Sequence, residues 1–415
     1  MPRQNLSLTR IAATLALGAI AGTAGAGPVR SAGAMSFASA DTLVISDWRA
    51  GELHALRLPP VRGAGSPQAF NLKDVSAAIA RALHTRPDSL GFEGMAFRPG
   101  TELAYLTLSV KRASQTPAPA LVTVDASGKV GLLDLAKLPH SSAAIQAAPA
   151  ADKRFWRDMP EATLTVTSLL FNDGKLYVAG LSNASFASTL RVYDFPFTGK
   201  AATTSSIEMY HAVHNQLETR APVRAMAIAT LNGEPSLVAA YTCTPLVTIP
   251  LKALTDGAHI IAKTIAELGW GSEPVDMVSF DAGQGPVILL ANSHKAADLM
   301  SVASIAEASA LPGLATPIKW PAEPLLGLKS TYVPLPGVAR LVDQDKDFIA
   351  ALRRNEASGA MELVSMRKGA FLRLSDFVNE YDFADFRYQA GDGFKGVHKT
   401  LRTDEGFADL ADRAQ

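Results

Sequence analysis

A short polar segment carries the residue types and spacing that could hold a metal ion. His211, His214 and Glu218 fall within eight residues of one another in MYHAVHNQLETRAPV. Imidazole nitrogens and a carboxylate oxygen suit zinc, copper or iron, and histidines three residues apart would share one face of a helix. The set is smaller than a full zinc-protease signature. A solvated loop in which Glu218 pairs with Arg220 or Arg224 therefore remains an alternative interpretation.

Alternating aspartates form a second candidate binding segment. Asp343, Asp345 and Asp347 stand in VDQDKDF, which is similar to the opening of a calcium loop. Such a loop needs a glycine at its sixth position and an acid at its twelfth. Phe348 and Arg354 occupy those positions, so the calcium pattern fails. A turn between strands with solvated carboxylates explains the segment better, and Asp343 is kept as a candidate binding residue.

Two further polar residues follow the apolar run VILLA. Asn292 and His294, in Asn292-Ser293-His294-Lys295, follow an apolar strand and could reach the mouth of a channel. The same tetrapeptide also makes an ordinary polar turn. We therefore treat Asn292 and His294 as candidate binding residues.

The chain lacks several signatures of known enzyme classes. A single cysteine, Cys243, excludes an intramolecular disulfide, a cysteine-based zinc site and a c-type haem attachment. Its surroundings show no neighbouring base, so a buried structural thiol is expected. The sequence contains no Gly-x-Ser-x-Gly elbow, phosphate-binding glycine loop or His-Glu-x-x-His. These absences count against a common serine hydrolase, a nucleotide enzyme and a zinc protease.

Short apolar or alternating strands, separated by Gly, Asn, Asp and Pro turns, dominate the chain from Met35 onward. The clearest helix is Asp74–Leu83, and the loop-like stretches are 114–119 and 141–153. The expected strands are Thr42–Trp48, Glu52–Leu58, Leu103–Val110, Leu121–Asp125, Val130–Leu135, Leu164–Phe171, Lys175–Ala179, Leu190–Phe195, Val223–Ala229, Ser236–Tyr241, Leu246–Pro250, Val275–Phe280, Val287–Ala291, Ala339–Val342, Phe348–Arg353 and Met361–Ser365.

The strands repeat in units that can be aligned on one apolar inner strand. The aligned segments are AMSF (34–37), GMAF (94–97), SLLF (168–171), AMAI (225–228) and DMVSF (276–280). Their spacing of about 50 to 75 residues suits four-stranded propeller blades with long loops. A β-sandwich would show similar strands without this repeat. We therefore predict an all-β fold, a six- or seven-bladed β-propeller of four-stranded antiparallel blades, in which 371–377 supplies an outer strand of the closing blade.

Over most of its length the repeat resembles the bacterial propeller group that includes the YVTN-type and lactonase-like proteins. Within it, FEGMAF (92–97) resembles the Glu-Gly opening of gluconolactonase-type and esterase-like phytase-type propellers. In the lactonase family the matching glutamate is a metal ligand at the central channel, so the resemblance implies that role for Glu93. The family's asparagines have no clear match, because Asn232-Gly233 falls in a turn between strands. Glu93 could instead cap or pair at the start of an inner strand.

The first residues are typical of an export signal. Arg3 and Arg10 precede the apolar run 11–21, which is too short for a membrane span, and Ala24-Gly25-Ala26 fits a cleavage site. Ala32-Gly33-Ala34 is a later alternative. We therefore expect a signal peptide over 1–26, with the cut as late as 34, then a propeller over 35–378 and a C-terminal extension over 379–415 packing on it.

Composition narrows the functional classes. The chain has 415 residues, and 39 Lys and Arg balance 39 Asp and Glu, which disfavours nucleic acid as a partner. We expect a periplasmic or secreted protein without a membrane span after cleavage, acting as a scaffold for a small-molecule ligand or a periplasmic protein. The alternative is a metal-dependent, lactonase- or esterase-like hydrolase with its site at the channel and one divalent metal. The sequence identifies no other cofactor.

Overall fold

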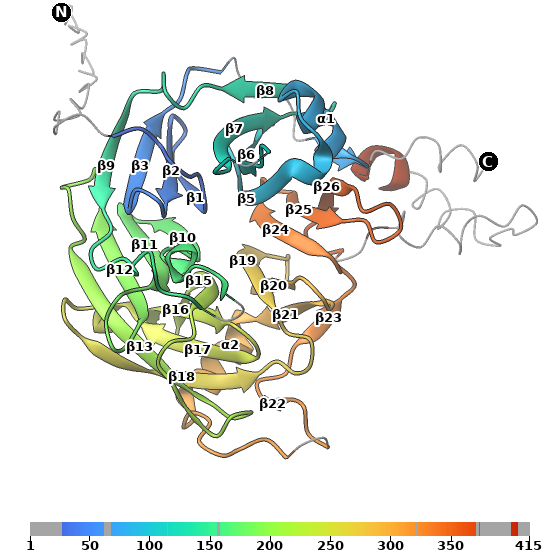
Figure 1. The fold of residues 1–415 in the computed structure, drawn as a ribbon. Helices are drawn as coiled ribbons and strands as arrows, with labels where there is room; N and C mark the ends of the chain where they lie inside the picture. The colour runs from blue at the N-terminus through green and yellow to red at the C-terminus, as the bar shows by residue number, and fades with distance from the viewer. Residues whose placement is uncertain are drawn as a thin grey trace, which may run out of the picture.

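The computed structural model describes residues 27–61, 68–113, 115–155, 158–319, 322–370, 373 and 400–405. Within these ranges the chain is nearly all β, and antiparallel sheets are arranged around a central axis like propeller blades (Figure 1). The predicted all-β propeller architecture is confirmed at this level. None of the described helices is long and apolar enough to cross a membrane. The predicted signal peptide and most of the C-terminal extension lie outside the described residues.

Four sheets of the described ranges contain four strands each. Within each sheet the strands are given in the order in which they lie side by side. One sheet has β1 (Met35–Ser39), β2 (Thr42–Asp47), β3 (Glu52–Arg57) and β9 (His140–Ala144), and another has β5 (Leu90–Phe97), β6 (Ala104–Val110), β7 (Ala118–Val124) and β8 (Val130–Leu133). The other two have β19 (Pro274–Asp281), β20 (Pro286–Asn292), β21 (Ala297–Ser301) and β23 (Thr331–Val333), and β24 (Val338–Asp343), β25 (Phe348–Arg354), β26 (Met361–Arg367) and β4 (Asn71–Leu72).

A larger ten-stranded sheet consists of two antiparallel four-stranded units and two added short strands. The units meet where the outer strands β13 and β18 pair in parallel, with Ser206 opposite His259. The strands are β10 (Ser168–Asn172), β11 (Lys175–Leu181), β12 (Ser188–Asp194), β13 (Thr203–His211), β14 (Gln216–Glu218), β15 (Val223–Leu231), β16 (Glu234–Tyr241), β17 (Pro245–Pro250), β18 (His259–Glu267) and β22 (Leu326–Gly327).

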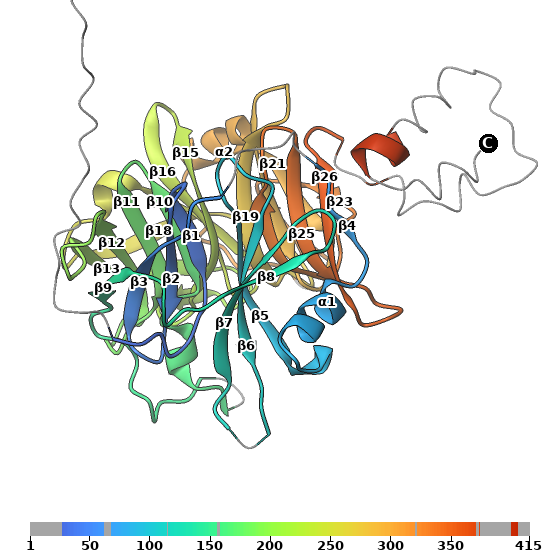
Figure 2. The same cartoon turned by 90° about the horizontal axis from the view of Figure 1, so that it is seen from above.

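The first strand of each unit faces the central axis. Around that axis β1 contacts β10, β10 contacts β15, β15 contacts β19, β19 contacts β24, β24 contacts β5, and β5 contacts β1 again. Figure 1 looks along this axis, and Figure 2 shows the same sheets from the side. The inner strands therefore form a closed circle, and none of them has an unpaired edge facing an open gap.

Apolar cores fill the spaces between neighbouring units. Met35, Met95, Met226, Met277 and Leu341 are each at most 9% exposed, and each belongs to a different core between two units. The four methionines occupy equivalent positions of the aligned inner strands, and Leu341 lies in the inner strand β24. Burial of apolar surface contributes about 25 cal/mol per Å². Cores on both faces of each sheet explain how a chain with one free cysteine is stable without a disulfide.

The last sheet of the chain takes its outer strand from a segment near the N-terminus, and this pairing closes the ring. β4 pairs with β26, with Leu72 opposite Leu363, so an N-terminal segment supplies the outer strand of the last sheet. The Phe70 N–H donates to Ser365 Oγ at 2.7 Å and fixes this register. The outer strand expected from residues 371–377 falls almost entirely outside the described residues, and β4 occupies that position in the sheet.

Helices are few and short in the part of the chain that the structure describes, in line with the sequence. α1 (Val75–Ala82) begins at Asp74, whose Oδ1 accepts from the Ala77 N–H at 2.8 Å, so the predicted helix is confirmed. The sequence did not reveal α2 (Val302–Ala310), which is capped by Ser301. Within the described ranges the other short helical turns are η1 (Pro87–Ser89), η3 (Glu161–Leu164), η4 (Leu251–Ala253) and η6 (Thr400–Asp404). The prediction of a loop over 141–153 is partly wrong, because residues 141–144 lie in β9.

Candidate functional site

A cavity of about 280 Å³ lies at one end of the central axis. Its wall is made by residues near the start of the inner strands and by the segment before β10, together with the ends of β2 and β6, the turn after β2 and the start of β7. The side chains with polar or aromatic character are Ser31, Ser46, Trp48, Arg49, Glu93, Ser109, Thr163, Thr167, Arg224 and Arg340. Three of these carry a positive charge and one a negative charge, so the cavity is cationic.

Bulges in four inner strands turn side chains toward this end of the axis. A bulge leaves one residue without a partner and re-aims its side chain. The pairing of β5, β15, β19 and β24 with their neighbours shifts near the start of each strand. The residues at these shifts are Glu93, Arg224, Val275 and Ala339, and the first three line the cavity.

Arg340 connects two neighbouring sheets at the rim of the cavity. Its Nε donates to the Glu93 carbonyl oxygen at 3.0 Å, and its Nη2 donates to the same oxygen at 2.5 Å. Its Nη1 donates to the Ala339 carbonyl at 2.8 Å. These bonds fix the position of the Arg340 guanidinium. Among the described side chains, no carboxylate is in direct contact with it.

Arg224 lines the same cavity and has no hydrogen-bond or ion-pair partner among the described residues. Burial, and next the charge of Arg340, lower the pKa of Arg224, while Glu273 and Asp276 raise it. An arginine remains charged under these conditions. Arg224 is therefore a cation whose donors are available to a ligand in the cavity.

Glu93 contributes one carboxylate to the cavity. Its Oε1 accepts from the Ser109 Oγ–H at 2.6 Å, and its backbone carbonyl is the one held by Arg340. The adjacent position needs a glycine, because a Cβ at Gly94 would lie 2.7 Å from the Gly33 carbonyl oxygen. The Glu-Gly pair thus brings the N-terminal segment against β5 and leaves the carboxylate facing the cavity.

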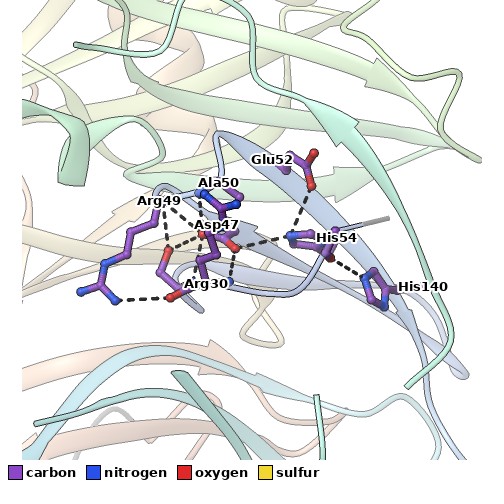
Figure 3. Close-up of polar contacts among 9 residues, drawn as sticks. Arg30, Asp47, Arg49, Ala50, Glu52, His54 and His140 are labelled. Atoms are coloured by element: carbon purple, nitrogen blue, oxygen red, sulfur yellow. Dashed lines mark hydrogen bonds and ion pairs between the residues drawn. The ribbon is translucent and has the colours of Figure 1, made fainter. Parts of the chain in front are cut away.

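The N-terminal segment that lines the cavity is held by Asp47 (Figure 3). The Asp47 carboxylate is fully buried and accepts from the N–H groups of Arg30 at 2.5 Å and Ser31 at 3.0 Å, and from Ser31 Oγ at 2.6 Å. It also accepts from the N–H groups of Arg49 and Ala50, both in the turn that follows. One carboxylate therefore ties two chain segments together at the cavity wall.

A buried histidine stands behind this carboxylate. His54 Nε2 lies 3.5 Å from Asp47 Oδ2 and 3.7 Å from Glu52 Oε2, and its ring packs edge-on against His140. Burial alone would raise the pKa of Asp47. The interactions with His54, Ser31 and backbone N–H groups outweigh burial and lower the pKa to about 2. Asp47 is therefore ionised throughout the neutral range.

A second cavity of about 390 Å³ lies further along the axis and has the opposite charge. Its charged lining residues are Asp276 and Asp343, and the rest is largely apolar. Asp276 Oδ2 accepts from the Leu341 N–H at 3.0 Å, and burial raises the Asp276 pKa. Asp343 pairs with Lys368 at 2.7 Å. The channel is thus cationic at the mouth near Glu93 and acidic in its other part.

The three predicted metal ligands of the histidine segment do come together. His211, His214 and Glu218 each offer one ligand atom, and these atoms lie within 4.8 Å of one another. The segment is a β-hairpin formed by β13 and β14, not a helix. Glu218 pairs with His214 at 2.7 Å, while Arg220 pairs with Glu161 instead. Among the described linings of the two cavities there is no histidine, so this cluster is separate from Glu93.

The cluster lies at the seam between the outer strands β13 and β18. Burial, and next the charge of His214, lower the pKa of His211 to about 4, so its ring is neutral at neutral pH. Cys243, directly before Thr244, is half-buried, and burial raises the pKa of its thiol. A raised thiol pKa fits the structural role expected for this cysteine.

The other two predicted binding residues have structural partners. Asn292 is fully buried, and its side chain donates to Asp298 Oδ2 at 2.9 Å and to the Ala296 carbonyl at 3.2 Å. His294 is exposed and pairs with Glu273 at 3.1 Å. Neither is among the residues that line the two cavities. Their positions therefore give no support to a role at the channel.

The arginines of the cavity do not stand out in the amino-acid sequence as candidate site residues. Arg224 and Arg340 stand in VRAMAI and VARLVD, each at or beside the bulge of an inner strand. Two of the aligned repeat segments begin at Gly94 and Ala225. The charged residue directly before each of them, Glu93 or Arg224, therefore lies just outside the alignment. A charged residue placed before the apolar core of an inner strand was the signal that could have found the site.

Comparisons with known proteins add no family. No family model and no curated protein matches the chain. Among solved structures, it is similar to a glucose dehydrogenase with 10% identity and a TM-score of 0.32, covering 82% of this chain and 97% of that one. It is also similar to the soluble aldose sugar dehydrogenase of Escherichia coli in its apo form, with 11% identity and a TM-score of 0.32, over 82% and 97% of the two chains. The hydrazine synthase of Kuenenia stuttgartiensis gives 12% identity and a TM-score of 0.32 over 84% and 99%.

These values carry no conclusion about substrate, cofactor or mechanism. The assignment of this chain to the β-propeller class rests on its own sheets, whose inner strands contact one another in a closed circle. Function has to be inferred from the residues of the sites, since one fold supports many functions.

Proposed function

We propose that this chain is an exported propeller that binds a small anionic molecule in the cavity lined by Glu93, Arg224 and Arg340. The observation that carries the proposal is the Arg224 guanidinium, which faces the cavity without a protein partner. A partly buried cation that lacks a partner costs free energy, and a bound anion removes that cost. A ligand with a carboxylate or phosphate group fits this requirement because it accepts two parallel hydrogen bonds from an arginine.

The rest of the wall supports a small ligand. Arg49 and Arg340 add positive charge, and the Glu93 carboxylate and the Ser109 hydroxyl, which donates its proton to Glu93, offer acceptors for a donor group of the ligand. The Trp48 ring, against which Arg49 packs at 4.9 Å, provides an aromatic surface. The volume of about 280 Å³ is close to the lower limit, roughly 300 Å³, for small-molecule sites. A small organic anion suits this space better than a protein partner does.

We further infer that the ring has six blades. Each of the inner strands β1, β5, β10, β15, β19 and β24 begins one four-stranded unit, and the contacts among them return to the start without a gap. The mature chain in this proposal begins at Gly27. A cut after Ala34 would remove Arg30 and Ser31, which hold the buried Asp47.

The alternative of a metal-dependent hydrolase at the channel receives less support. Such a site needs several metal ligands at one place. The carboxylates of the described channel lining are divided, with Glu93 in the first cavity and Asp276 and Asp343 in the second. The arginines around Glu93 would also repel a divalent cation. Anion binding is therefore the better match to the mouth of the channel.

Native mass spectrometry of protein exported by a bacterial host tests the proposal. The tag-free protein should carry a fraction of chains with one additional small mass, which collision in the gas phase releases as an anion. The Arg224→Gln variant should lose that species, and the control Arg86→Gln should keep it, because Arg86 is exposed and pairs with Asp88 outside the cavity. An adduct that persists in Arg224→Gln would contradict the assignment.

A further inference from the structure

We propose that His211, His214 and Glu218 form a site for one divalent transition-metal ion at the seam between β13 and β18. This site is distinct from the cationic cavity and does not depend on an anion bound there. The proposed ion is zinc or a metal with similar ligand preferences, since two imidazoles and one carboxylate are the ligands that such ions take in sites with an open position.

The distances suit a single ion. His214 Nδ1 lies 2.7 Å from Glu218 Oε1, and His211 Nδ1 lies 3.8 Å from the same oxygen. Zinc bonds to nitrogen and oxygen of about 2.0 to 2.2 Å place tetrahedral ligand atoms about 3.3 Å apart. The two rings have centroids 4.2 Å apart. Small rotations of the exposed His214 side chain would therefore bring all three ligand atoms around one ion.

The tautomer of His211 is set by the residues behind it. The Thr244 hydroxyl donates its single proton to Glu267 Oε2, and its oxygen lies 3.1 Å from His211 Nε2. The hydroxyl must therefore accept from His211, so Nε2 carries the proton and Nδ1 presents its lone pair to Glu218 and His214. A metal-binding histidine usually donates its other ring N–H to a carboxylate, a backbone carbonyl or water, and here the Thr244 hydroxyl takes that place.

The buried Glu267 also holds the backbone of the hairpin beside His211. It is fully buried on β18, and its Oε1 accepts from the Ala212 N–H at 2.6 Å, directly beside His211. The Thr264 hydroxyl on the same strand donates to the Tyr210 carbonyl at 2.7 Å. The hairpin with the three ligands is thus held on the neighbouring unit. An ion bound there would stabilise the seam between the two units, with water at its open position.

Titration of the tag-free, chelator-treated protein with Zn²⁺ in a calorimeter tests the proposal, with Co²⁺ absorption as a second readout. The wild type should bind one ion per chain and unfold at a higher temperature with Zn²⁺ than without. His214→Ala should weaken Zn²⁺ binding by at least ten-fold, and Thr244→Val should weaken it by about ten- to a hundred-fold through the loss of the supporting hydroxyl. Circular dichroism of each variant verifies that it is folded.

His294→Ala is the matched control. His294 is an exposed histidine paired with a glutamate at 3.1 Å, so it has the same chemistry without a third ligand. This variant should bind Zn²⁺ as the wild type does. The proposal is wrong if the wild type binds no Zn²⁺ below millimolar concentrations, or if folded His214→Ala and Glu218→Gln bind it with unchanged stoichiometry and affinity.

Discussion

Arg340 donates from Nε to the backbone carbonyl of Glu93 across 3.0 Å, and so joins the first strands of two neighbouring sheets. This bond fixes one arginine of the cationic cavity. Its neighbour Arg224 has no such bond among the described residues, although the two charges are close enough for Arg340 to lower the Arg224 pKa. One arginine therefore builds the wall of the cavity, and the other is available to a ligand.

Replacement of the buried carboxylate behind the cavity should destabilise the fold. Asp47→Asn retains the shape of the side chain but removes the charge that accepts from Arg30, Ser31 and Ala50. Hydrogen bonds to a charged group contribute about 1.5 to 3 kcal/mol, so we expect a loss of about 2 to 3 kcal/mol in the free energy of unfolding. Urea unfolding measures it. The exposed Asp134→Asn, next to Lys137, should leave the free energy of unfolding nearly unchanged.

The same carboxylate predicts a pH dependence. The Asp47 pKa is lowered from 3.8 to about 2 in the folded protein, so the unfolded chain takes up its proton first as the pH falls. The stabilisation is complete above pH 3.8 and is lost as the pH falls from 3.8 toward 2. The stability difference between wild type and Asp47→Asn should therefore be constant from pH 7 to 5 and shrink below pH 4. An unchanged difference at pH 3 would contradict the lowered pKa.

The position of the signal cut can be measured directly. Intact-mass analysis of the exported protein should give a chain that begins at Gly27. A protein expressed from Met35 should unfold at a lower temperature than one expressed from Gly27, because it lacks Ser31 and the buried Ala32. A mature chain that begins at Met35 with full stability would show that the segment 27–34 does not hold the fold.

Gly94 should tolerate no side chain. A Cβ at this position would lie 2.7 Å from both the Gly33 carbonyl oxygen and Thr107 Oγ1, which donates to that oxygen. We expect Gly94→Ala to cost about 1 to 3 kcal/mol of stability, as overpacking does elsewhere. Chemical denaturation measures this loss. Gly27→Ala is the control, since a Cβ there meets nothing within 4 Å.

The sequence revealed the scaffold well because inner strands carry a strong apolar signal. The aligned segments that contain Met95, Met226 and Met277 all lie in inner strands, and these methionines fill the cores between units. The outer strands were harder to find. β13 (TTSSIEMYH) and β18 (HIIAKTIAE) mix polar and apolar residues without a regular alternation, and β4 has two residues supplied by a distant part of the chain.

The sites were only partly accessible to sequence reasoning. His211, His214 and Glu218 were found because they are close in sequence, yet their hairpin and the support from Glu267 depend on pairing between distant strands. Arg224 was mentioned only as an ion-pair partner for Glu218. Its place in the cavity follows from a bulge and from ring closure, which no local pattern encodes.

Titration calorimetry with inorganic phosphate and succinate as probe anions tests the central claim most directly. The wild type should bind at least one of them with one site per chain, and Arg224→Gln should weaken that binding at least ten-fold, about 1.4 kcal/mol, while Arg86→Gln should leave it unchanged. Higher salt should weaken binding, as expected for a charge pair. Equal affinity of wild type and folded Arg224→Gln, or binding of neither anion by the wild type, would contradict the assignment of an anion site to the cavity at Arg224.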